Sequence, residues 1–305
     1  FLAQEETTDR KYVRGPPVGI DLNIDRIKLS KGKYLNQVFG RLENDGLVWS
    51  NINLNSIFDE KKSLKNILPP KGLRKSLEIN LSPKAGKREL QVKSSDAGWV
   101  FNMLGFYKNI IGGKLALEAT FEDMSVDSKV TGTIKIHKFR LVDAPVLARL
   151  LSIASITGIP DELGGEGLKF AELGATFSLE SGIINIKNAK AGGFSLGITA
   201  SGVIDRDAET LNIKGSVAPL DMVNSLLEKA LRKVPLFGDF FSGGEKGGGL
   251  FAAEYSMVGP IDDPEIKTNP LTALTPGIFR KIFQILPGKT TNGRATEWHD
   301  PDDPN

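Results

Sequence analysis

The chain of 305 residues contains no cysteine and only two histidines, His137 and His299. The absence of cysteine excludes disulfide bonds, thiolate metal sites, iron–sulfur clusters and cysteine nucleophiles. The scarcity of histidine excludes most histidine-rich metal sites and leaves little capacity for general-base catalysis near neutral pH. We therefore expect a protein that is not an enzyme and that binds no metal ion and no cofactor.

The sequence also lacks an excess of one charge and a long hydrophobic run. Lys and Arg number 39 against 37 Asp and Glu, so the net charge is +2 and nothing favours nucleic acid as a partner. The longest strongly apolar stretches are about a dozen residues, whereas a transmembrane helix needs roughly 20. Residues 1–14 are polar and do not form a signal peptide, so we interpret the chain as the C-terminal piece of a longer protein.

What the sequence does contain is alternation of apolar and polar residues with a period of two, which is typical of half-buried β-strands. The alternating runs are 18–29, 77–81, 90–92, 115–121, 134–141, 194–204, 211–217 and 251–257. Residues 82–86 have the composition of a turn that joins 77–81 to 90–92 as a hairpin. The apolar phase slips at Ile27 and again at Phe139, which predicts β-bulges. We expect a mostly β protein, a long curved antiparallel sheet of about a dozen strands.

Helices are predicted to be few, short and apolar or amphipathic. The segments are 143–158, 221–234 and 274–286, with 99–111 as a possible fourth. Glycine pairs at 112–113, 192–193 and 248–249 each precede two extended segments and one of the first three helices, which suggests a repeated strand–strand–helix unit. We divide the chain into a polar lead-in (1–17), a β-groove domain (18–286) and a disordered tail (287–305).

Three motifs have a chemical interpretation and a simpler structural one. Residues 193–197 match the G-x-S-x-G pattern of hydrolases, but Ser195 lies within an alternating run instead of a strand-to-helix turn. The acidic pairs at 262–263 and 302–303 adjoin prolines and are interpreted as a turn and a solvated tail. The basic segment 61–75 could contact anionic lipid or nucleic acid, or form a solvated loop, and it has no interleaved aromatic residues to stack on bases.

A dozen strands with three short helices leave part of an apolar sheet face uncovered. Such a face marks a binding surface, and a long one suits acyl chains. The helices either cover the sheet or lie in a bilayer interface, and 274–286 fits the interface best because bulky apolar residues oppose Arg280 and Lys281.

Three stretches of the chain resemble a known family. They are 96–117 (DAGWVFNMLGFYKNIIGGKLAL), 144–170 (APVLARLLSIASITGIPDELGGEGLKF) and 248–283, in which NPL…LTPG…R…F is the most specific part. Together with the strands between them, they resemble the C-terminal region of the AsmA-like (YhdP-type) envelope proteins of Gram-negative bacteria, which form a bridge-like lipid-transfer family. The resemblance covers roughly residues 79 to 286.

The resemblance implies a periplasmic part of a longer protein anchored in the inner membrane. Its open hydrophobic groove conducts phospholipid towards the outer membrane, and the family brings no catalytic residues. The expected partners are phospholipid acyl chains, a membrane surface and other envelope proteins. The alternative is a non-catalytic structural or protein-interaction module that binds a partner by addition of a strand to the sheet edge.

Candidate site residues follow from the groove hypothesis. Residues expected to contact acyl chains are Leu115, Leu117, Phe121, Phe194, Leu196 and Ile198. Helix residues expected to contact the membrane or cap the groove are Leu147, Leu150, Leu151, Leu226, Leu227, Ile278, Phe279, Ile282 and Phe283. Which strand face lines the groove stays open at this point, because either phase is geometrically possible.

Overall fold

The computed structural model describes residues 12–30, 33–59, 75–153, 167–193, 196–219 and 252–271. The first seven strands are β1 (Val18–Ser30), β2 (Lys33–Asn44), β3 (Trp49–Asp59), β4 (Lys75–Lys84), β5 (Lys87–Ser94), β6 (Ile110–Phe121) and β7 (Val130–Leu141). The remaining strands are β8 (Leu168–Glu180), β9 (Ile183–Gly193), β10 (Leu196–Asp205), β11 (Thr210–Pro219), β12 (Ala252–Pro260) and β13 (Glu265–Leu271). Two helices occur in the described residues, α1 (Ala97–Met103) and α2 (Pro145–Ile153).

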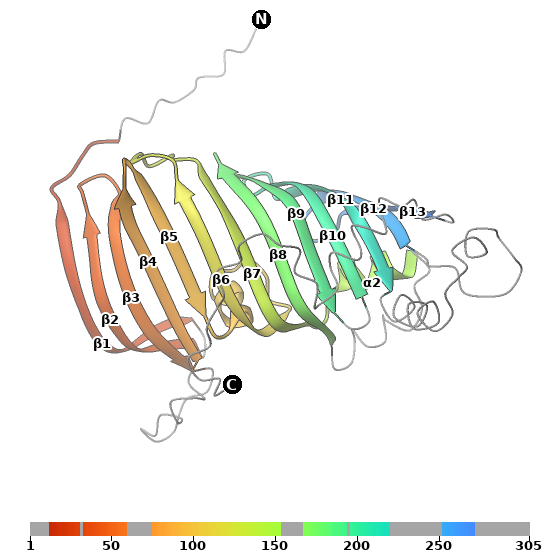
Figure 1. The fold of residues 1–305 in the computed structure, drawn as a ribbon, viewed down its shortest axis with the longest axis horizontal. Helices are drawn as coiled ribbons and strands as arrows, with labels where there is room; N and C mark the ends of the chain where they lie inside the picture. Colours follow the sequence, from red (N-terminus) through yellow and green to blue (C-terminus); the bar gives the residue numbers. More distant parts are fainter. Residues whose placement is uncertain are drawn as a thin grey trace, which may run out of the picture.

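All thirteen strands form one sheet in which each strand pairs with its neighbours in the sequence (Figure 1). Every pairing is antiparallel, so the sheet is an open meander whose edge strands are β1 and β13. The prediction of a mostly β, curved antiparallel sheet with few short helices is confirmed. The expected helices 221–234 and 274–286 and the expected tail 287–305 lie outside the described residues. Within the described part of the chain, no helix is long and apolar enough to cross a membrane.

The register of the hairpin between β4 and β5 is fixed by the short turn that joins these strands. Leu81 lies opposite Leu90 and Lys84 opposite Lys87, so the turn contains only Ala85 and Gly86. Both turn residues have positive φ, 50° and 78°. This is the two-residue hairpin geometry whose twist matches that of the flanking strands. The turn is shorter than the five residues expected from composition.

The two predicted phase slips have different physical causes. Opposite the slip in β1, the pairing of β2 with β3 shifts between Asn36 and Phe39, and Gln37 has φ 49°, so a bulge lies in the neighbouring strand. At the second slip the pairing of β7 stays in register on both sides, but Lys138 has φ 54°. This left-handed residue lets Ile136 and Phe139 both be buried, at 1% and 2% exposed. The second slip is therefore a local backbone twist instead of a bulge.

Helix α1 is shorter than the segment 99–111 suggested. The Asp96 side chain accepts a hydrogen bond from the Trp99 backbone N–H at 2.9 Å and caps the helix N-terminus. The helix stops before Gly105, whose φ of 71° is a left-handed conformation that commonly ends a helix. The chain then enters β6 at Ile110.

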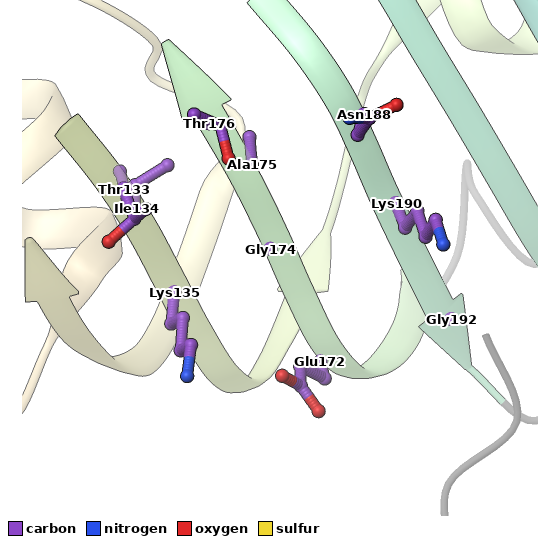
Figure 2. Close-up of a pocket in the computed structure, with 10 residues that line it drawn as sticks. All are labelled: Thr133, Ile134, Lys135, Glu172, Gly174, Ala175, Thr176, Asn188, Lys190 and Gly192. Carbon is purple, nitrogen blue, oxygen red and sulfur yellow. The ribbon is translucent and has the colours of Figure 1, made fainter. Parts of the chain in front are cut away.

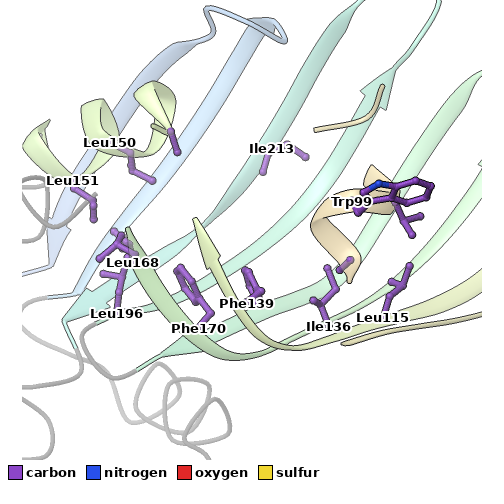
Figure 3. Close-up of a cluster of buried hydrophobic side chains, with 14 of the residues drawn as sticks. Trp99, Leu115, Ile136, Phe139, Leu150, Leu151, Leu168, Phe170, Leu196 and Ile213 are labelled. Atoms are coloured by element: carbon purple, nitrogen blue, oxygen red, sulfur yellow. The ribbon is translucent and has the colours of Figure 1, made fainter. Parts of the chain in front are cut away.

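Both helices lie on the same face of the sheet, and the strands curve around that face (Figure 3). Trp99 of α1 stacks on Phe58 of β3 with ring centroids 4.0 Å apart. In α2, Leu150 and Leu151 are buried at 2% and 0% exposed and belong to the same apolar cluster as Trp99. The core of the protein is therefore a layer between the two helices and the curved sheet.

Candidate functional site

A continuous row of apolar and glycine positions crosses the entire sheet on the face that carries the helices. Residues opposite one another in neighbouring strands share a face, so the register defines the row. We call it the apolar track, and its members from β1 to β13 are Ile20, Leu42, Ile52, Leu81, Leu90, Ala119, Gly132, Phe177, Ile186, Gly202, Ile213, Met257 and Ile266. With strands about 4.8 Å apart, the track is roughly 55–60 Å long.

Most large side chains of the apolar track are only half-buried, although Leu81 and Ile213 are buried, at 4% and 5% exposed. Leu42, Ile52, Leu90, Phe177, Ile186, Met257 and Ile266 are all of intermediate exposure, and Ile20 on the edge strand is 37% exposed. These residues therefore present a long apolar surface to whatever occupies the inside of the curve. An apolar surface of this length and continuity is typical of a binding site for an apolar ligand.

A second row on the same face is covered instead of open. This covered row consists of Ser56, Leu77, Ser94, Leu115, Ile136, Leu173, Ala191, Ile198, Val217 and Ala253. Most of its members are buried, with Val217 at 0% and Ile136 at 1% exposed. It lies towards the strand ends at Ser94 and Leu141, after which α1 and α2 begin. The covered row thus lies on the half of the apolar face where the helices begin, whereas the track runs along the other half and reaches the core cluster at Ile213.

The structure places all described members of the predicted lining set on this apolar face, but not all on its open part. Leu115 and Leu196 are buried, at 5% and 2% exposed, so they belong to the core. Leu117 and Ile198 are half-buried. Phe194 lies outside the described residues.

The predicted helix residues fall into two groups. Leu150 and Leu151 are buried and Leu147 is half-buried, and all three pack in or against the core cluster. Helix α2 therefore caps part of the apolar face. The other candidates, Leu226, Leu227, Ile278, Phe279, Ile282 and Phe283, lie outside the described residues.

None of the thirteen residues of the apolar track was among the lining residues predicted from the sequence. Strand β3 shows the signal that was available: Ile52 and Leu54 alternate with Asn51, Asn53 and Asn55. Phe177 and Ile186 lie in β8 and β9, which were not recognised as strands. No pattern within a single strand shows that these residues form one row, because the row exists only through the register of twelve strand pairs.

Phe121, the remaining predicted lining residue, is covered by a buried arginine at the margin of the face. The guanidinium of Arg88 lies 4.3 Å from the Phe121 ring centroid, and Arg88 is 5% exposed. Arg88 donates hydrogen bonds to the carbonyl oxygens of Trp49 (3.2 Å), Asp123 (3.3 Å) and Ser125 (3.0 Å). Burial lowers the pKa of Arg88 because desolvation disfavours the charged form. Arg88 of β5 thus bonds to the first residue of β3 and to the connection between β6 and β7, and it closes this margin.

The opposite face of the sheet is polar and carries a shallow cavity of about 330 Å³ (Figure 2). The cavity spans β7, β8 and β9, where the pairing of β8 with β9 shifts between Gly174 and Thr176. Its lining includes Thr133, Lys135, Glu172, Thr176 and Lys190. Three charged side chains, Lys135, Glu172 and Lys190, lie beside the apolar Ile134 and Ala175 in this lining, so it offers an acyl chain no continuous apolar contact.

The alternatives that involve chemistry find little geometric support in the described residues. Gly193 ends β9 and Leu196 begins β10, and these two strands pair antiparallel, whereas a nucleophile elbow needs a strand followed by a helix. Ser195 itself lies outside the described residues. The described part of the chain contains no cluster of three or more residues that could hold a metal ion.

Comparisons with protein-family models, curated proteins and solved structures found no match to this chain.

Proposed function

We propose that this chain is a lipid-transfer module whose apolar track binds the acyl chains of phospholipid. The observation that carries the proposal is the continuous apolar row across thirteen strands, roughly 55–60 Å long, most of whose large side chains are only half-buried. A bilayer hydrocarbon core is only about 30 Å thick for two leaflets, so the track has room for several acyl chains in succession. A long open surface of this kind suits passage of lipid better than storage of one molecule.

The contrast between the two faces supports the same proposal. Strand β7 directs Ile134 and Ile136 to the apolar face and Thr133, Lys135 and His137 to the other. A sheet with one solvated face needs its other face covered, and in the described residues α1 and α2 cover only the half that contains the buried row. Burial of each large apolar side chain by a ligand stabilises the complex by about 1.5 to 3 kcal/mol at full burial.

The wider setting follows from the resemblance to AsmA-like envelope proteins. The proposal therefore extends to a periplasmic module of a longer, inner-membrane-anchored protein that contributes to phospholipid transport to the outer membrane and to envelope integrity. In this setting the partners are phospholipid acyl chains, a membrane surface and other envelope proteins.

Mass spectrometry of organic extracts tests the proposal directly. The chain is purified from bacteria in its folded state, extracted, and compared with the same protein washed under denaturing conditions. We expect phospholipid at one or more molecules per chain in the folded sample and little in the control. A folded protein with a lipid-free extract, which also takes up no phospholipid from vesicles, contradicts lipid transfer.

A second candidate function is favoured by the difference between the two sheet edges. Strand β13 has seven residues, including Lys267 and Pro270, whereas β1 has thirteen residues and no proline. Ile20 and Ile24 of β1 are 37% and 36% exposed. A long edge without proline can accept another strand, so β1 fits a protein-interaction module that works by strand addition.

The simplest available partner for β1 is β1 of a second copy. Under this second function, sedimentation shows concentration-dependent dimers, and Ile20→Lys with Ile24→Lys abolishes them because charged side chains protect an edge. Dimers that persist in the double variant, or a strictly monomeric wild type, count against strand addition at β1.

A further inference from the structure

Helix α1 covers a small set of polar groups within the otherwise apolar face. Ser56 and Ser94 flank Leu77 in the covered row and are 4% and 5% exposed. Asp96, at 5% exposed, caps the helix. Polar groups this deeply buried normally have hydrogen-bond partners, so each of them can be checked in turn.

The serines and the aspartate are all satisfied by the protein itself. Ser94 Oγ donates to the Ser76 carbonyl oxygen at 2.9 Å, and Ser56 Oγ to that of Ile57 at 3.2 Å. Asp96 Oδ1 accepts from the Trp99 backbone, and Asp96 Oδ2 lies 2.6 Å from Lys75 Nζ. The aspartate and the lysine neutralise one another, so this group carries no net charge.

Trp99 is the exception. Its side chain is 2% exposed, and among the described residues its indole Nε1 is the buried side-chain nitrogen or oxygen atom that has no hydrogen-bond partner. The ring (Figure 3) stacks on Phe58 with centroids 4.0 Å apart, which fixes its position. A buried N–H without an acceptor destabilises the folded protein by about 1–3 kcal/mol. An acceptor atom on a bound ligand removes this cost, so the free N–H favours ligand binding at this position.

We propose that the Trp99 indole N–H donates a hydrogen bond to a neutral oxygen of the bound lipid, which is an ester carbonyl. This inference rests on the proposed lipid-transfer function. A carbonyl fits better than a phosphate because the nearby Lys75–Asp96 pair offers no surplus positive charge. Half-buried Leu54, Ile79 and Val92 pack against the cluster that contains Trp99 and provide apolar contacts for the adjoining acyl chains.

The position of Trp99 also defines where the glycerol part of the lipid binds. In this proposal the ester group lies beside the indole, which is stacked on Phe58 of β3. The acyl chains then extend from β3 along the apolar track. Trp99 is thus a specificity-determining residue that distinguishes acyl esters from ligands that offer only hydrocarbon.

Ester and ether lipids of identical headgroup and chain length test the inference. The probes are dioleoyl phosphatidylglycerol and its dioleyl ether analogue, which lacks both carbonyl groups. We expect the wild-type chain to bind the ester lipid roughly five- to tenfold more tightly, the effect of one buried hydrogen bond. Trp99→Phe keeps an aromatic ring but removes the N–H, so it should bind the two lipids equally. Trp49→Phe, at a residue that is 40% exposed, is the matched control and should keep the preference.

The outcomes separate this inference from the proposed function. If wild-type protein binds neither lipid, lipid transfer itself is wrong. If it binds both lipids equally, the apolar track is sufficient and the role of Trp99 is overturned. A preference that survives in a folded Trp99→Phe variant also overturns it, and the wild-type comparison remains informative even if that variant does not fold.

Discussion

The two faces of this sheet are made by the same thirteen strands, yet they differ in almost every physical property. In β7, Ile136 is 1% exposed while its neighbours in sequence, Lys135 and His137, are exposed on the other face. The apolar face is further divided into a half packed under α1 and α2 and a half that contains the apolar track. The alternating sequence of a strand shows which side chains lie on the apolar face. Only the burial of each side chain in the structure shows whether it belongs to the core or to the candidate ligand surface.

The largest expected effect comes from adjacent residues of β7 on opposite faces. Ile136→Ala removes a side chain from the covered row and should lower the free energy of unfolding by about 2–5 kcal/mol, because it leaves a cavity under a well-packed core. Lys135→Ala on the polar face should change it by less than about 0.5 kcal/mol. Urea unfolding followed by circular dichroism measures both. Equal losses for the two variants contradict the assignment of the faces.

A pH-dependent effect is expected from Tyr255, which places a hydroxyl within the apolar face. The hydroxyl donates to the Thr199 carbonyl oxygen at 2.8 Å, and burial raises the pKa of Tyr255 to about 12 from the ordinary value of 10.0. Between these values the unfolded chain releases the proton first, so stability is present below pH 10 and is lost as the pH rises towards 12. The two-unit shift corresponds to roughly 2–3 kcal/mol.

The matched variant for this effect is Tyr255→Phe. At neutral pH it should be less stable than wild type by about 1 kcal/mol, since one buried hydrogen bond is lost. As the pH rises above 10, the free energy of unfolding of the wild type should fall relative to that of the variant. The variant has no hydroxyl at position 255 that could titrate. Parallel stability curves for both proteins between pH 9 and 12 run counter to a buried, protonated Tyr255.

A smaller effect, on lipid affinity, is expected when the same charge is added to one face or to the other. Ile52→Asp adds a carboxylate to the apolar track, whereas Asn53→Asp adds the same charge on the polar face. If the track binds acyl chains, Ile52→Asp should weaken phospholipid binding by about tenfold or more, because the charge must be desolvated. Asn53→Asp should bind as wild type does. Binding to vesicles of dioleoyl phosphatidylglycerol, with circular dichroism as a folding control, provides the measurement.

The smallest effect is expected where α2 reaches the connection between β12 and β13. Arg149 Nη1 lies 2.6 Å from Asp263 Oδ1, and Arg149 also donates to the Pro264 carbonyl oxygen. Both charged side chains are substantially exposed, at 43% and 79%. Asp263→Ala should therefore cost less than about 1 kcal/mol, and the difference should shrink at high salt. A loss of several kcal/mol would instead make this pair a principal attachment of α2.

Much of the sheet could be predicted from the chain. Alternation at period two located β1, β4 to β7 and β10 to β12, because each of these strands has one buried and one solvated face. Strands β2, β3, β8, β9 and β13 were not identified separately. In β2 and β9, bulges at Gln37 and Asn188 interrupt the alternation, and both residues have positive φ.

The candidate site was less predictable than the fold. Leu115 and Leu196 have the same periodic pattern as Leu117 and Ile198, yet the first two are buried and the others are half-buried. Pattern alone does not distinguish them, since it reports which face a side chain is on and not what covers that face. The unsatisfied Trp99 Nε1 is likewise invisible in sequence, because it depends on the atoms around one ring.

The amino-acid sequence by itself determined the strand period, the polarity of the two faces and the presence of short helices, all of which depend on interactions between residues near one another in the chain. The tertiary structure decided that twelve registers align into one apolar track, that α1 and α2 cover only half of the face, and that Trp99 lies against Phe58. The physical reason is that register and coverage arise from packing between distant segments, and a local pattern is compatible with more than one such packing.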